Sequence, residues 1–98
     1  MNYKIKVLWL GTSLGLAINQ TSFDNSSLIT PYYFWPRTDA WGQLKTELSS
    51  KLWISKREKI IVLNRVSDIM NYWQENRKIQ NLEKVKKIYT DIDFVGIV

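Results

Sequence analysis

The 98-residue chain contains neither cysteine nor histidine. Without cysteine it has no disulfide, no thiolate nucleophile and no cysteine-ligated metal. Without histidine it also lacks the most common general base and metal ligand of proteins. These two absences exclude most familiar enzyme mechanisms. We therefore expect a protein that is not an enzyme and that uses no cofactor, no metal and no small-molecule substrate.

Long apolar runs are missing as well. No segment approaches the ~20 consecutive apolar residues that a membrane-spanning helix needs. The first residues, "MNYKIKVLWLG", are interrupted by lysines and alternate like a strand, so they do not read as a targeting segment. We expect a soluble protein that has no membrane partner and is made where it works.

Apolar residues are nevertheless plentiful, since 45% of the chain is hydrophobic and 13% aromatic, which is too much for a disordered protein. A chain of this length can form one domain with a small core. The formal net charge is +5 and is unevenly spread. Residues 1–49 hold four Lys/Arg against three acids, whereas residues 50–98 hold ten against six. The sequence predicts a folded basic domain whose positive charge lies in its second half.

The first thirty residues predict a β-hairpin followed by a loop. Apolar side chains alternate with others over residues 3–10 and again over residues 14–20, and "GTS" between them is typical of a turn. Small residues such as Gly15 on the outer face suggest that something packs closely there. Residues 21–30 are rich in Ser, Thr, Asn and Asp, which favours a loop.

Two helices are predicted in the middle of the chain. Thr38 or Asp39 can cap the first, whose apolar stripe is formed by Trp41, Leu44 and Leu48. The second covers about residues 56–75 and begins with a capping box of Ser55 and Glu58. Its apolar stripe recurs at helical spacing and consists of Ile60, Val62, Leu63, Val66, Ile69, Met70 and Trp73.

The end of the chain is less regular. Residues 79–89 allow another helix or an extension of the second one, and the β-branched residues of "TDIDFVGIV" favour an extended segment. Asp91 and Asp93 could share a divalent cation, but they lack the further oxygen ligands of such a site, so we interpret them as solvated acids. The order of elements predicts an α+β fold: an N-terminal antiparallel hairpin and an extended aromatic segment packed on two helices, with a basic C-terminal extension.

The aromatic segment "TPYYFWPR", residues 30–37, has two interpretations. Exposed aromatic rings can stack nucleic-acid bases, and buried ones can fill a core. In an extended chain Tyr32 and Phe34 point one way and Tyr33 and Trp35 the other, so at least one pair should be buried. We predict that Trp35 and one tyrosine lock the hairpin to the helices, while Arg37 faces outward.

Four further tryptophans lie on predicted apolar faces and would share that core: Trp9, Trp41, Trp53 and Trp73.

Two groups of basic residues are candidates for contact with RNA phosphates. Lys56, Arg57 and Lys59 crowd the first turn of the second helix, where cations oppose the helix dipole and an anion would be favoured. The alternative is that they are ordinary solvated lysines and arginine. A second cluster lies near the C-terminus and consists of Arg77, Lys78, Lys84, Lys86 and Lys87. Its alternative is a solvated helix face in which Glu83 pairs with Lys87. Neither group distinguishes RNA from DNA.

Several short motifs between about residues 4 and 75 together resemble the plastid-specific small-subunit ribosomal protein 3 family. They are Val7-Leu8-Trp9-Leu10, "TPYYFWPR", Asp39-Ala40-Trp41, Gln43-Leu44-Lys45, Glu47-Leu48, Trp53-Ile54-Ser55, Leu63-Asn64 and Tyr72-Trp73-Gln74. The chain departs from that pattern at Leu52, where a proline often stands, at Gly42, where an acid is usual, and in the hairpin turn.

The resemblance implies a structural constituent of the chloroplast 30S subunit, with 16S ribosomal RNA and other small-subunit proteins as partners and with no catalytic activity. It further implies a location in the plastid stroma and a gene in the plastid itself. On this basis we expect residues 1–75 to be the ribosomal protein domain and residues 76–98 a basic C-terminal extension. The alternative function is a free protein-binding adaptor or translation regulator that is not stably bound to the ribosome.

Overall fold

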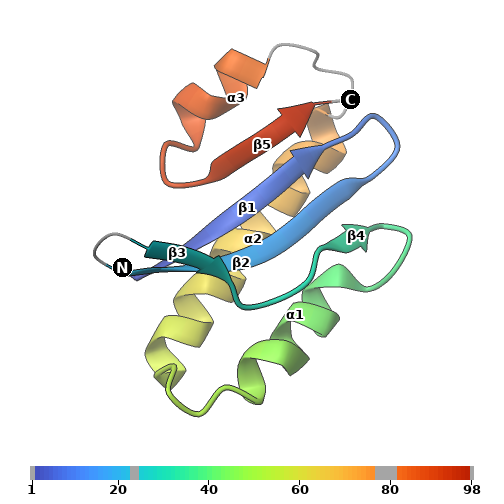
Figure 1. Cartoon of the computed structure of the whole chain (residues 1–98). Coiled ribbons are helices and arrows are strands. Elements are labelled where there is room, and N and C mark those ends of the chain that lie inside the picture. The colour runs from blue at the N-terminus through green and yellow to red at the C-terminus, as the bar shows by residue number, and fades with distance from the viewer. Residues whose placement is uncertain (1, 23–24, 77–81, 98) are drawn as a thin grey trace.

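A mixed five-stranded sheet forms the centre of the protein, with α1 and α2 against one of its faces (Figure 1). The computed structural model describes residues 2–22, 25–76 and 82–97. Its elements in chain order are β1 Tyr3–Trp9, β2 Leu14–Ser22, β3 Asn25–Leu28, β4 Tyr33–Trp35, α1 Ala40–Ser49, α2 Lys56–Asn76, α3 Leu82–Ile88 and β5 Asp93–Ile97. The predicted α+β class is therefore confirmed.

The predicted N-terminal hairpin is present. β1 and β2 pair antiparallel from Tyr3 opposite Gln20 to Trp9 opposite Leu14, and the Leu10 amide donates to the Ser13 carbonyl at 3.1 Å in the turn. Every second side chain of β1 is buried, as strand periodicity requires. These inward side chains form the part of the core that the sheet contributes.

The loop predicted for residues 21–30 is wrong in part. β2 continues to Ser22, and β3 returns beside it as an antiparallel edge strand in which Leu28 lies opposite Asn19. Strand pairing uses backbone groups, so a polar segment at the edge of a sheet can pair without any apolar pattern. The hairpin is thus extended into a three-stranded meander.

The C-terminal segment returns to the same sheet. β5 confirms the extended conformation expected there and pairs parallel with β1, with Phe94 opposite Val7. The register shifts between Val7 and Leu8, so the pairing contains an irregularity typical of a β-bulge. The sheet order is β3-β2-β1-β5, with β4 also paired to β2. The division of the chain into residues 1–75 and 76–98 stays a prediction.

Both predicted helices and their caps are confirmed. The Gly42 amide donates to the Asp39 carboxylate at 3.1 Å at the start of α1. At the start of α2 the Glu58 amide donates to the Ser55 hydroxyl at 3.1 Å, and that hydroxyl donates to the Glu58 carboxylate at 3.0 Å. The second bond therefore joins the two side chains, whereas a full capping box joins the carboxylate to the backbone. No helix in the described part of the chain is long and apolar enough to cross a membrane.

Two apolar residues expected in the core are instead exposed. Ile60 is 52% exposed, because it lies about 200° around the helix from the buried Val62. Trp53 is 62% exposed and lies in the turn before α2, outside the helical stripe that buries Trp73. The apolar face of α2 therefore begins at Val62.

The aromatic segment is divided between the two faces of the sheet. β4 places Tyr33 opposite Leu16 and Trp35 opposite Leu14, and both rings pack against the core. The Tyr33 hydroxyl donates to the Glu47 carboxylate of α1 at 3.1 Å. This confirms that Trp35 and one tyrosine join the hairpin to the helices.

Phe34 of the same segment points to the opposite face, where it lies over Gly15. A Cβ at Gly15 would stand 2.9 Å from the Phe34 ring and 3.0 Å from the Leu8 Cβ. The close packing suggested by the small outward residues of β2 is therefore confirmed at this position.

Arg65 of α2 fastens the C-terminal segment to the rest of the protein. Its guanidinium donates to both carboxylate oxygens of Asp91, at 2.8 and 2.6 Å, and lies 4.7 Å from the centroid of the Tyr89 ring. Tyr89 in turn meets Tyr72 of α2 edge to face, with centroids 5.3 Å apart. Asp91 is thus an ion-pair partner and not merely a solvated acid.

We predict that Gly15→Val lowers the free energy of unfolding by about 1–3 kcal/mol, because the new methyl groups overlap the Phe34 ring. Urea titration followed by circular dichroism measures the change. Gly11→Val is the matched control, since nothing lies within 4 Å of a Cβ there. Equal stability of the two variants would show that Phe34 does not rest on Gly15.

We also predict that Asp91→Asn destabilises the protein at neutral pH by about 1 kcal/mol or less, because the ion pair is partly solvated. The hydrogen bonds from Arg65 lower the pKa of Asp91 from its usual 3.8. A lowered pKa in the folded state adds stability above pH 4, and this stability is lost as the pH falls through that lowered value.

The stability difference between the parent protein and Asp91→Asn should therefore shrink in acid, as measured by urea midpoints across pH. Asp68→Asn is the control, because its carboxylate makes only a 3.4 Å contact with the same guanidinium. A pH-independent difference for Asp91→Asn would contradict the prediction.

Candidate nucleic-acid interface

The first turn of α2 does not present its three cations in one direction. Lys56 and Arg57 are exposed, whereas Lys59 is half-buried. Lys56 and Lys59 are neighbours at i,i+3, but Arg57 lies about 160° from Lys59 around the helix axis. Glu58 is in the same turn and offsets part of the positive charge. This turn can offer two lysines to one phosphate and an arginine to another.

The C-terminal candidates lie on α3. Lys84, Lys86 and Lys87 are all exposed, while Val85 between them is fully buried and holds the helix against the protein. The Lys86 ammonium lies 3.7 Å from the Glu83 carboxylate, and its side chain remains 45% exposed. Such an exposed pair contributes little stability and leaves the lysine available for another anion. Arg77 and Lys78 lie outside the described residues.

Arg37 confirms the expectation that it faces outward. It is exposed in the turn between β4 and α1, where the Thr38 amide donates to the Phe34 carbonyl at 2.9 Å. A shallow hollow lies beside it and is lined by Tyr32, Tyr33, Phe34, Arg37, Thr38 and Gln43. Arg37 is therefore a basic group at the edge of the aromatic segment.

The fold separates these candidates into three places. In Figure 1 the start of α2 lies at one end of the molecule, α3 at the other, and the turn between β4 and α1 at a side. The candidates therefore do not form a single patch. A nucleic acid that touched all three places would have to follow the outline of the domain.

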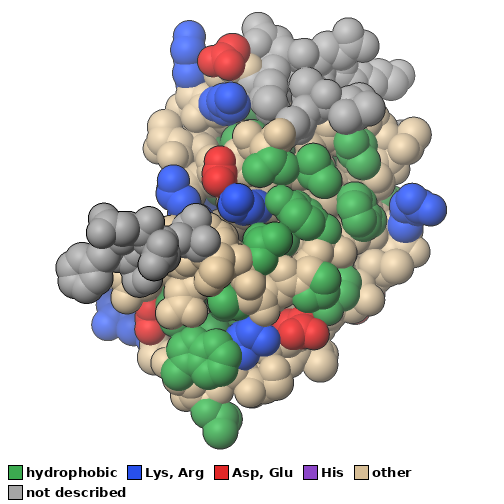
Figure 2. Space-filling view, in the orientation of Figure 1, with side chains coloured by type: hydrophobic (Ala, Val, Ile, Leu, Met, Phe, Trp, Pro, Cys, Tyr) green, Lys and Arg blue, Asp and Glu red, His purple; other side chains and the backbone are tan. Residues whose placement is uncertain are grey.

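The sheet face opposite α1 and α2 is open and largely apolar. Figure 2 shows hydrophobic side chains gathered over its middle, with charged side chains around them. Phe34 and Leu8 are half-buried there, and the exposed fraction of Val95 is 45%. Lys6 and Asp93 form an ion pair of 3.8 Å beside them. The character of this face suits a protein neighbour better than an RNA backbone.

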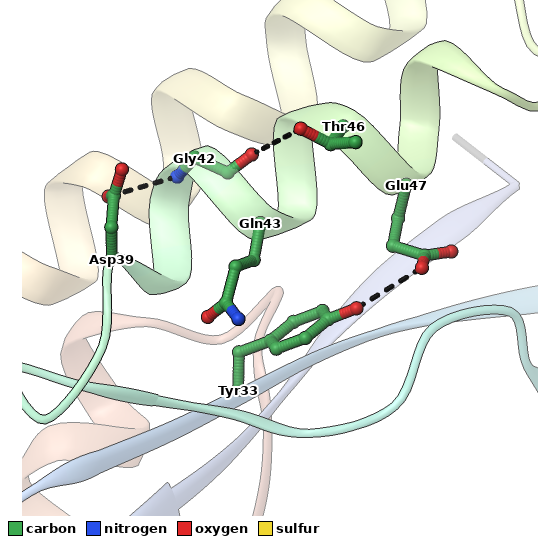
Figure 3. Close-up of a pocket in the computed structure, with 6 residues that line it drawn as sticks. All are labelled: Tyr33, Asp39, Gly42, Gln43, Thr46 and Glu47. Atoms are coloured by element: carbon green, nitrogen blue, oxygen red, sulfur yellow. Dashed lines mark hydrogen bonds between the residues drawn. The ribbon is translucent and has the colours of Figure 1, made fainter.

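A polar groove lies between β4 and α1, and several of its lining residues already hydrogen-bond to one another (Figure 3). Glu47 accepts from Tyr33, Asp39 accepts from the Gly42 amide, and Thr46 donates to the Gly42 carbonyl at 3.0 Å. Burial, together with the hydrogen bond to Glu47, raises the pKa of Tyr33. The two carboxylates repel phosphate, so this groove is not part of the interface.

Sequence reasoning missed one feature of this surface, the exposed indole of Trp53. The Lys51 ammonium lies 5.9 Å from the centroid of its ring. Its exposure could have been predicted from the sequence, because Trp53 stands two residues before the cap Ser55 and so lies outside the helix and its apolar stripe. Metal sites are also absent from the described residues, where no group of three or more acidic side chains is arranged to hold an ion.

Comparison with known proteins places the chain among ribosomal proteins. The family model described as plastid and cyanobacterial ribosomal protein (PSRP-3 / Ycf65) matches residues 29–76. The small ribosomal subunit protein cS23 of Gracilaria tenuistipitata var. liui is 44% identical over 94 residues, which cover 96% of this chain and 95% of that protein. The chain belongs to the PSRP-3/Ycf65 family.

Two further relatives show similar identity over most of the chain. The protein of the same name from Cyanidium caldarium is 45% identical over 92 residues, 92% of this chain and 91% of its own. The probable cS23 protein of Synechococcus sp. (strain JA-3-3Ab) is 41% identical over 90 residues, again 92% and 91%. An alignment of 94 residues must pass residue 75, so the likeness extends further along the chain than its motifs indicated.

Proposed function

We propose that this protein is a structural constituent of the small 30S subunit of a plastid ribosome, where it contacts 16S ribosomal RNA and neighbouring proteins and supports translation. The observation that carries the proposal is its 44% identity, over nearly the whole chain, to a protein named for the small ribosomal subunit. The absence of histidine and cysteine from the sequence supports a structural role without catalysis.

The RNA contacts in this proposal are phosphate contacts, which position a protein without reading sequence. They come from Arg37, from Lys56, Arg57 and Lys59, and from the C-terminal cluster of Arg77, Lys78, Lys84, Lys86 and Lys87. Since the described members of this set lie at separate places, the RNA that they contact would follow the outline of the domain. The basic segment after residue 76 would add a second group of phosphate contacts.

The open sheet face is proposed as the contact with neighbouring small-subunit proteins. Its half-buried and exposed apolar side chains, among them Leu8, Phe34 and Val95, gain stability when a partner removes them from water. This division gives the basic ends to RNA and the apolar sheet face to protein.

The proposed location is the plastid stroma, with the gene in the same compartment. The family's description names plastids, which supports the proposed location of the protein. The same description also names cyanobacteria, so a cyanobacterial ribosome is the alternative location.

We predict that the protein sediments with small subunits in a sucrose gradient and stays with them through a wash of moderate salt. A free adaptor or regulator would remain near the top of the gradient. Immunoblotting of the fractions, with a known small-subunit protein as reference, separates the two results. Recovery only at the top would overturn the proposed function.

We predict that Lys56→Glu with Arg57→Glu weakens binding to small-subunit rRNA by at least about ten-fold at moderate salt. The slope of log affinity against log salt should also fall by nearly one for each lost phosphate contact. Lys4→Glu with Lys45→Glu makes the same change of net charge at two exposed lysines outside the candidate set and is the matched control. Equal effects of both pairs would mean that net charge alone, and not this turn, governs binding.

A further inference from the structure

The most exposed apolar side chains of the described chain lie together in the turn that joins α1 to α2. Leu52 is 90% exposed and Trp53 is 62% exposed, while the next residue, Ile54, is only 3% exposed. The Ile54 amide donates to the Lys51 carbonyl at 3.2 Å and closes the turn. The buried isoleucine therefore anchors a short turn that holds the two preceding side chains in solvent.

Polar contacts connect the Trp53 ring, through Lys51 and Glu47, to Tyr33 of the sheet. The Tyr33 hydroxyl of β4 donates to Glu47 at 3.1 Å, and the other oxygen of Glu47 lies 3.3 Å from the Lys51 ammonium. Lys51 lies over the indole, yet its own side chain is only 13% exposed. Lys51 is thus held beside the ring by Glu47, while Trp53 stays 62% exposed.

The charges around this ring are mainly positive. Lys51 lies against it, and Lys56 and Lys59 share one side of the helix that follows three residues later. Glu47 is paired with Lys51, whereas Glu58 accepts from the neutral Ser55 hydroxyl and offsets only part of the positive charge. A partner at this place must offer a flat apolar group together with negative charge.

We propose that Trp53 is a stacking platform for an unpaired base of ribosomal RNA, with Lys56 and Lys59 contacting the adjoining phosphates. The inference rests on the proposed function and adds to it a ligand class, a single-stranded nucleotide, because only an unpaired base exposes its face to an aromatic ring. An acidic protein segment is the competing occupant, and the experiment distinguishes the two.

The test is equilibrium binding of the full chain to an oligoadenylate of about twelve nucleotides and to an RNA duplex of similar length, followed by fluorescence anisotropy. Trp53→Ala should weaken binding to oligoadenylate by about ten-fold, within the range measured for single stacked bases. Trp53→Phe keeps a ring and should stay within about three-fold of the parent protein. Duplex binding should be unchanged in both variants, because paired bases are already stacked.

Leu52→Ala is the matched control, since it removes an exposed apolar side chain from the same turn without removing a ring. It should leave both affinities unchanged. The salt slope of Trp53→Ala should equal that of the parent protein, because stacking releases no counterions. Circular dichroism checks that each variant is folded.

The outcomes separate the inference from the function on which it rests. Absence of salt-dependent binding to either RNA by the parent protein would argue against the proposed RNA contact itself. Normal salt-dependent binding that is equally strong in Trp53→Ala would overturn the stacking platform alone. If Trp53→Ala and Leu52→Ala both release the protein from small subunits while oligoadenylate binding is unchanged, the turn contacts a protein, and the proposal is wrong.

Discussion

The pairing of β1 with strands of both directions is the constraint on which the rest of the structure depends. β1 is antiparallel to β2 and parallel to β5, so it joins the start of the chain to its end. Its inward side chains are all buried and form the floor on which α2 packs. Immediately after β1, the Leu10 carbonyl accepts a hydrogen bond of 2.8 Å from the Trp73 indole. Loss of β1 would therefore leave α2 without a strand to pack on and β5 without a strand to pair with.

The aromatic residues serve this core through their polar ends as well as their area. Trp41 of α1 donates to the Leu63 carbonyl of α2 at 3.0 Å, Trp73 joins α2 to the hairpin, and Tyr33 joins β4 to α1. Each of these bonds fixes the direction of a large ring that packs in or against the core, which apolar contact alone does not do. Trp53 is different, because its ring lies in solvent and its contact with Lys51 is electrostatic.

The features that the sequence predicted well are those with a local cause. The alternation of β1, the Asp39 cap and the stripe from Val62 to Trp73 are each set by residues a few positions apart. The strand β3 could not be predicted in this way, because its polar residues pair through the backbone at a sheet edge. The parallel partner of β5 lies more than eighty residues away, and the Arg65–Asp91 pair joins residues separated by 26 positions. The candidate RNA contacts could be chosen by residue type, but their division among three places follows from those distant pairings.

The fold uses some of its cations for stability and leaves others exposed. Arg65 joins α2 to the C-terminal segment through a charge-assisted bond of 2.6 Å to Asp91. Lys51 pairs with Glu47 four residues earlier, and Lys6 forms a weaker, partly exposed pair with Asp93 at 3.8 Å. Arg37, Lys56, Arg57, Lys84 and Lys87 are instead exposed on turns and helix surfaces. The paired cations join neighbouring segments of the fold, whereas the exposed ones extend from its surface at separate places. The fold therefore separates the cations that hold its segments together from those that stay available as candidate phosphate contacts.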